Sequence, residues 1–95
     1  MILFYNHLPS IDLHGYDRDY ARIKINEFIE DQFKMKNTNI VIIHGNGSGI
    51  LKKTTQETLR RNKYIKDYQI HNYNSGMTIV TLKKICWHNG RFVLL

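Results

Sequence analysis

The sequence predicts an α/β fold, in detail a two-layer α+β sandwich with two helices on one face of a mixed sheet. Two segments, 17–36 and 50–64, place their apolar residues at helical spacing. Residues 40–43 (Ile-Val-Ile-Ile) form an unbroken aliphatic run, which is typical of a strand buried on both faces. The predicted order is strand, helix, strand, helix, strand, strand, and this order favours helices packed on one side of the sheet.

The first half of the chain is divided by clear local signals. Residues 1–9 are predicted to be a short lead-in that ends at Pro9. The alternation of polar and apolar residues over 10–14 predicts a strand, and Asp17 is the predicted N-cap of the first helix. The side chains expected to pack inward from this helix are Ala21, Ile25, Phe28, Ile29, Gln32, Phe33 and Met35.

The second half carries weaker strand signals. Strands are predicted over 68–73 and 77–85, and the pair Asn89-Gly90 between two apolar runs is typical of a hairpin turn. We therefore expect residues 84–95 to form a terminal hairpin or one more edge strand. The whole chain, 1–95, is expected to be one domain with a core over about 8–83. From the second helix, the residues expected to face inward are Leu51, Thr55, Thr58 and Leu59.

The composition favours an anionic partner. Fourteen Lys and Arg residues against eight Asp and Glu give a net charge of +6, which predicts nucleic acid, with an acidic membrane surface as the competing partner. No apolar face accompanies the basic one, so the membrane drops out and no membrane partner is expected. The single cysteine excludes an internal disulfide framework, and the apolar run over 1–5 is shorter than a signal peptide or spanning helix needs. We expect a cytoplasmic protein.

Two histidine–glycine turns carry the candidate chemistry. Asp12 and His14 share one face of the first predicted strand, so the carboxylate can orient or charge-stabilise the imidazole. His44 follows the buried aliphatic strand. If the first helix joins two parallel strands, both histidines lie at the carboxyl edge of the sheet, where open α/β sheets bind ligands. The candidate catalytic residues are therefore Asp12, His14 and His44.

The loop over 44–49 (His-Gly-Asn-Gly-Ser-Gly) predicts a phosphate site, because glycines let amide N–H groups point outward at the start of a helix. The spacing matches neither the dinucleotide fingerprint nor a Walker A loop, so no nucleotide cofactor is expected. The candidate phosphate- or nucleic-acid-binding residues are Gly45, Asn46, Gly47, Ser48, Gly49, Lys52, Lys53, Arg60 and Arg61.

Three segments together resemble the Smr (small MutS-related) domain family. They are 11–15 (Ile-Asp-Leu-His-Gly), 44–51 (His-Gly-Asn-Gly-Ser-Gly-Ile-Leu) and 75–82 (Ser-Gly-Met-Thr-Ile-Val-Thr-Leu). The resemblance implies a βαβαββ fold similar to the C-terminal domain of bacterial translation initiation factor three. It also implies nucleic-acid binding, often with endonuclease activity on branched DNA or on messenger RNA at stalled or collided ribosomes.

Two positions depart from the family's pattern. Asn46 stands where the family often has Lys or Arg, and Lys52 replaces an Arg that commonly follows the loop leucine. Both changes weaken a phosphate clamp, since Asn46 has no charge and lysine lacks the guanidinium fork. The positions that match the family's motifs are Asp12, His14, His44, Gly45 and Gly47.

The sequence thus predicts a stand-alone nucleic-acid endonuclease with RNA as its first substrate and the ribosome as a candidate partner. His14 and His44 would share the roles of general base and general acid, and the ribose 2′-OH would be the nucleophile without a metal. One alternative is a non-catalytic module that docks on RNA or the ribosome. Another is a DNA-nicking endonuclease of recombination or repair, for which a divalent ion (Mg²⁺ or Mn²⁺) on Asp12 is expected.

Overall fold

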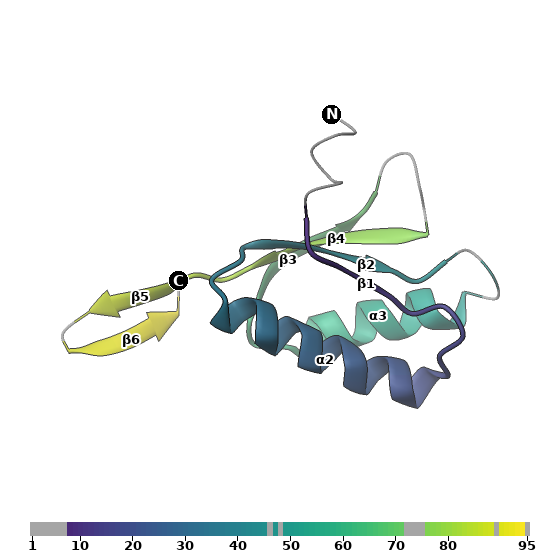
Figure 1. The fold of residues 1–95 in the computed structure, drawn as a ribbon, viewed down its shortest axis with the longest axis horizontal. Helices are drawn as coiled ribbons and strands as arrows, with labels where there is room; N and C mark the ends of the chain where they lie inside the picture. Colours follow the sequence, from purple (N-terminus) through teal and green to yellow (C-terminus); the bar gives the residue numbers. More distant parts are fainter. Residues whose placement is uncertain (1–7, 46, 48, 72–75, 89, 95) are drawn as a thin grey trace.

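The structure is a computed structural model that describes residues 8–45, 47, 49–71, 76–88 and 90–94 (Figure 1). Its elements follow one another in the predicted order, with a hairpin added at the end. They are β1 (Ser10–Asp12), α2 (Arg18–Lys34), β2 (Asn39–Ile43), α3 (Ile50–Arg61), β3 (Ile65–Ile70), β4 (Met77–Leu82), β5 (Ile85–His88) and β6 (Arg91–Leu94).

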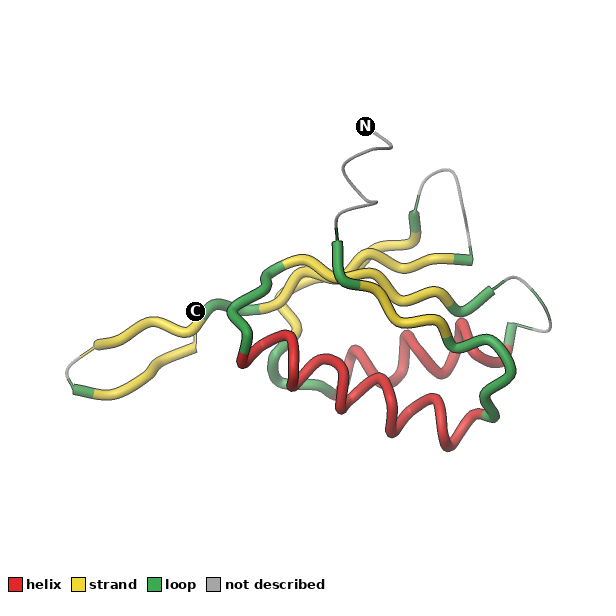
Figure 2. The backbone as a smooth tube through the Cα atoms, in the orientation of Figure 1, coloured by secondary structure: helices red, strands yellow, loops and turns green. Residues whose placement is uncertain are grey.

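The first four strands form one mixed sheet in the order β1-β2-β4-β3. β1 runs parallel to β2, with Ser10 opposite Val41, whereas β4 is antiparallel to both β2 and β3. Both helices lie against the same face of this sheet (Figures 1 and 2). The predicted two-layer fold is confirmed.

The core lies between the helices and the central strands. Ile40 and Ile42 of β2 are fully buried there, together with Val80 of β4. Asp17 caps α2 as predicted, because its carboxylate accepts the N–H of Tyr20 at 2.7 Å. From the helices, the buried core residues are Ala21, Ile25, Ile29, Gln32, Phe33, Thr54, Thr55, Thr58 and Leu59.

One predicted core residue is exposed. Met35 keeps 65% of its surface accessible, because α2 ends at Lys34 and Met35 is already the C-cap. Phe28 and Leu51 are only half-buried at the edge of the core. At the C-terminal end of α2 the core is covered instead by Phe33, whose ring stacks on Tyr64 with centroids 4.3 Å apart.

Several predicted boundaries were too late. α3 ends at Arg61, three residues early, because Asn62 adopts an extended conformation and its side chain accepts the N–H of Tyr64 at 2.8 Å. This turn lets β3 begin at Ile65. Residues 72 and 73 of the predicted third strand lie outside the described part of the chain.

At the C-terminal end, β5 and β6 form a two-stranded hairpin and do not add an edge strand to the larger sheet. Among the described strands, β5 and β6 pair with each other alone, from Ile85 opposite Leu94 to His88 opposite Arg91, as a separate two-stranded sheet. The hairpin extends away from the helices and the larger sheet (Figure 1). No helix in the described part of the chain is long and apolar enough to cross a membrane.

Candidate functional site

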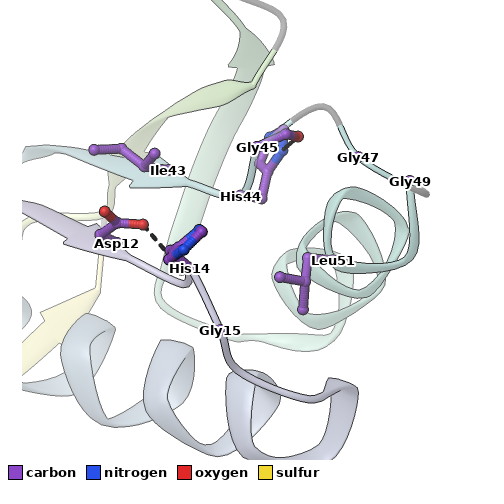
Figure 3. Close-up of a pocket in the computed structure, with 9 residues that line it drawn as sticks. All are labelled: Asp12, His14, Gly15, Ile43, His44, Gly45, Gly47, Gly49 and Leu51. Carbon is purple, nitrogen blue, oxygen red and sulfur yellow. Dashed lines mark hydrogen bonds between the residues drawn. The ribbon is translucent and has the colours of Figure 1, made fainter.

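The two histidine turns meet at one edge of the sheet. Because β1 and β2 are parallel, with Asp12 opposite Ile43, the segments that follow both strands emerge on the same side. They border a cavity of about 540 Å³ (Figure 3). The residues that line it are Asp12, His14, Gly15, Ile43, His44, Gly45, Gly47, Gly49 and Leu51.

Asp12 does not act on His14 in the expected way. Its Oδ1 accepts the main-chain N–H of His14 at 2.9 Å, so the carboxylate fixes the turn after β1 and leaves the imidazole outside this bond. His14 is exposed to solvent at the rim of the cavity. An exposed imidazole can exchange protons with a ligand in the cavity without first breaking a buried contact.

His44 lies in a different environment. Only 6% of its surface is accessible, and both ring nitrogens are hydrogen-bonded. Nδ1 lies 3.0 Å from the carbonyl oxygen of Gly45, and Nε2 lies 2.8 Å from Oγ1 of Thr78. A carbonyl can only accept, so we assign the proton to Nδ1, which leaves Nε2 of the neutral ring to accept the Thr78 hydroxyl.

Burial lowers the pKa of His44 below its usual value of 6.5. The hydrogen bond to the Gly45 carbonyl raises the pKa in part, and the positive charge of Lys52 lowers it further. His44 is therefore neutral at neutral pH. Its bonds connect the glycine loop to β4, which favours a positioning role over proton transfer.

The loop itself is fixed by main-chain contacts. The N–H groups of His44 and Gly45 both donate to the carbonyl oxygen of Gly76 at 2.9 Å. Because the N–H of Gly45 already donates to Gly76, the phosphate site predicted over 45–49 lacks this amide as a donor. Gly45 and Gly49 have φ values of 76° and 83°, a region that non-glycine residues rarely adopt. Asn46 and Ser48 lie outside the described residues.

The start of α3 faces the same cavity and favours an anion. Gly49 is its N-cap and has no side chain to satisfy the first amides. The first turn, 50–53, carries no acidic residue, whereas Lys52 and Lys53 add positive charge. The partial positive charge of the helix end therefore lies beside the cavity, where it attracts an anion.

The four basic residues predicted to bind nucleic acid lie at the two ends of α3. Lys52 is close enough to His44 for its charge to lower the histidine pKa, and Lys53 is exposed in the same turn. Arg60 and Arg61 stand in the last turn, roughly 16 Å from the loop at 1.5 Å per residue. The structure therefore does not bring these two arginines to the cavity.

The sequence reasoning missed Thr78 as a site residue. It is fully buried on β4 and opposite Ile42, from which it reaches the His44 ring. A signal existed, because Thr78 is a polar residue in the otherwise apolar start of that strand.

A metal site with a full set of protein ligands is not formed by the described residues. Within that part of the chain, no three His, Cys, Asp or Glu side chains are close enough together to hold an ion. Asp12 is the one carboxylate among the described residues that line the cavity. A hard divalent ion would then depend on this carboxylate, on water and on oxygens of the substrate.

The fold and this site define an Smr domain. The family's sequence model, described as the Smr domain, matches residues 11–83, and the chain belongs to this family. A protein named Endonuclease MutS2 from Clostridium botulinum is 34% identical over 76 residues. A protein of the same name from Caldanaerobacter subterraneus is 31% identical over 77 residues. These matches cover 77% and 81% of this chain, which spans about 10% of each relative.

Solved structures agree with the fold. The Smr domain of Thermus thermophilus MutS2 superposes with a TM-score of 0.77 at 24% identity, over 79% of this chain and 98% of that one. YdaL of Escherichia coli, described as a stand-alone small MutS-related protein, gives a TM-score of 0.69 at 23% identity, over 77% of this chain and 63% of that one.

Proposed function

We propose that this domain binds nucleic acid and cleaves it as an endonuclease, with RNA as substrate. The observation that carries the proposal is the exposed imidazole of His14 beside the same cavity as the glycine loop and the N-cap of α3. A phosphate held by the helix end would lie within the cavity that His14 borders. The relatives named Endonuclease MutS2 support the same class of activity.

In the proposed reaction, His14 takes the proton from a ribose 2′-OH. The 2′-oxygen attacks the neighbouring phosphorus, and the bond from phosphorus to the 5′-oxygen breaks. The products are a 2′,3′-cyclic phosphate and a 5′-hydroxyl, whose proton comes from water or from the protonated His14. The amides at the start of α3 and Lys52 stabilise the charge that develops on the phosphate.

We assign His44 to positioning rather than to a share of the proton transfer that the sequence predicts for the two histidines. Both its nitrogens already bond to Gly45 and Thr78, and burial disfavours its charged form. In this assignment His44 holds the glycine loop at the shape that receives the phosphate.

Two other functions are separated by the same assay. A non-catalytic module that docks on RNA or the ribosome is favoured by Asn46, which supplies no charge where the family often has a basic residue. A DNA-nicking enzyme would use Asp12 and substrate oxygens to hold Mg²⁺ or Mn²⁺, and water would then be the nucleophile.

The test uses end-labelled single-stranded RNA, the matching DNA and a branched DNA, each with and without EDTA. We expect cleavage of RNA in EDTA, with cyclic-phosphate ends, and its loss in His14→Ala. Gln69→Ala, an exposed change on β3, is the control and should cleave normally. RNA binding without cleavage of any substrate would establish the docking module instead. Cleavage of DNA that needs a divalent ion would establish the nickase.

A further inference from the structure

A row of hollows leads from the cavity along the surface between α2 and α3, which lie side by side in Figures 1 and 2. Leu51 lines both the cavity and the next hollow, and Arg18 lines that hollow and the one beyond it. Arg22 and Arg61 line the third hollow and also the last. We name this row the helix groove, and it is continuous with the candidate site.

The far end of the helix groove has the chemistry of a phosphate site. Arg22, Arg61 and Lys63 line a hollow of about 250 Å³ there. None of the described residues that line this hollow is a carboxylate. The amides of Asn26 and Asn62, joined at 3.1 Å, form part of its wall. One guanidinium group can donate two parallel hydrogen bonds to the oxygens of a phosphate. The side chains of Arg22, Arg61 and Lys63 are all exposed to solvent.

An ion pair within the helix groove does not block this site. Arg22 Nη2 lies 3.2 Å from Oδ1 of Asp19, and both side chains are more than half exposed. Exposed pairs of this kind contribute little to stability, so a phosphate can take the guanidinium from Asp19.

The middle of the helix groove has a different character. Asp17, Asp19 and Glu57 place carboxylates there, so this part does not fit phosphate. Ile50, with 54% of its surface accessible, exposes apolar area in the hollow next to the cavity, and Tyr16 lines the same hollow. The ring of Tyr16 packs edge-on against Tyr20 with centroids 4.8 Å apart, which gives a base a rigid aromatic surface.

We propose that a single RNA strand runs from the cavity along the helix groove and that Arg22, Arg61 and Lys63 bind a second phosphate at its far end. The inference rests on the proposed function, because it takes RNA as the ligand of the cavity. The length of α3 separates the two phosphate sites by roughly 16 Å. At about 3.4 Å per nucleotide, the spacing along one strand of a DNA duplex, that distance corresponds to about five nucleotide steps.

A matched surface on the same chain serves as the control. Lys83 and Lys84 line a hollow with Lys36 beside the ends of α2 and β4, away from the cavity. The double variants Arg22→Gln/Arg61→Gln and Lys83→Gln/Lys84→Gln each remove two positive charges. All four substitutions keep a polar side chain, and a difference between the variants therefore reports position rather than net charge.

Binding is measured by fluorescence anisotropy with 2′-O-methyl RNAs of three and eight nucleotides, which lack the 2′-OH nucleophile. We expect Arg22→Gln/Arg61→Gln to weaken binding of the eight-nucleotide strand at least tenfold and to leave the three-nucleotide strand within twofold. The slope of log affinity against log salt should fall by about 0.7 for each phosphate that the variant no longer neutralises. Lys83→Gln/Lys84→Gln should stay within twofold for both strands.

Glu57→Gln gives a test of opposite sign. Removing this carboxylate from the middle of the helix groove should tighten binding of the eight-nucleotide strand about twofold or more. Circular dichroism and thermal unfolding of each variant establish that these surface changes leave the fold intact.

The proposed path would be overturned if the two double variants lost affinity equally. It would also be overturned if neither lost affinity, and the helix groove would then be left to an acidic protein partner. The proposed function fails separately. If His14→Ala cleaves normally while Arg22→Gln/Arg61→Gln binds weakly, the catalytic assignment falls and the helix groove stands.

Discussion

The two histidine turns share the dipeptide His-Gly just beyond a strand, with His14 two residues after β1 and His44 one residue after β2. Their side chains differ in burial and in hydrogen bonding. His14 follows β1, which lies at the edge of the sheet and has β2 as its one neighbour among the described strands. His44 follows β2, which is flanked by β1 on one side and by β4 on the other. Thr78 of β4 therefore reaches the His44 ring, whereas His14 stays exposed. The position of each strand in the sheet, together with the one-residue offset of His14, separates an exposed histidine from a buried one.

The largest expected difference between the two turns is in catalysis. His14→Ala should lower the single-turnover rate of RNA cleavage by roughly 100- to 10,000-fold, the usual contribution of a positioned proton acceptor. The free energy of unfolding should hardly change, because His14 is exposed. His44→Ala should lower both the rate and the stability. If His14→Ala unfolds more easily than His44→Ala in urea, the comparison fails.

The next effect is in stability. Thr78→Val keeps the shape of the side chain but leaves Nε2 of His44 without its donor. Loss of a buried hydrogen-bond partner should lower the free energy of unfolding by about 1–3 kcal/mol. Thr81→Val on the same strand is the control, because Thr81 is only half-buried and its bond to Asn39 is long at 3.4 Å. Urea unfolding of the two variants should separate them, and equal losses would count against the His44–Thr78 bond.

The smallest effect is on pH dependence. The folded-state pKa of His44 is lowered below 6.5, so its contribution to stability is complete above about pH 6.5 and is lost as the pH falls through the folded-state value. Thermal unfolding from pH 8 to pH 5 should therefore show a fall below pH 6.5. His44→Gln, which cannot titrate, should flatten that fall, and His14→Gln should leave it in place. The opposite pattern would assign the titration to the exposed turn.

Much of this arrangement was predictable from the residues, because local signals and topology agree. The N-cap at Asp17, the buried run over 40–43 and the meeting of the two histidine turns all follow from capping, hydrophobic pattern and parallel pairing. The sequence alone could not predict which residues of neighbouring strands contact one another. The bond from Thr78 to His44 joins residues 34 positions apart, and the double use of the Gly76 carbonyl depends on the exact register of β4.

The separation of the arginines was also outside the reach of the sequence. Arg60 and Arg61 are near Lys52 in the chain, and a basic stretch on one predicted helix gives no measure of which hollow each side chain borders. The structure places Arg61 beside Arg22 of the other helix. A charge pattern thus predicts the kind of partner, while packing decides where the partner is held.

The central position of β2 has a consequence for how the chain folds. Val41 pairs with Ser10, 31 residues earlier, and with Ile79, 38 residues later. The two strands that flank β2 therefore come from distant parts of the chain. Closing these long loops costs conformational entropy before the contacts between the strands can form. During synthesis, β2 and the helix α2 leave the ribosome well before β4 does. Until β4 has emerged, one edge of β2 stays unpaired, and the nascent chain must avoid association through that edge.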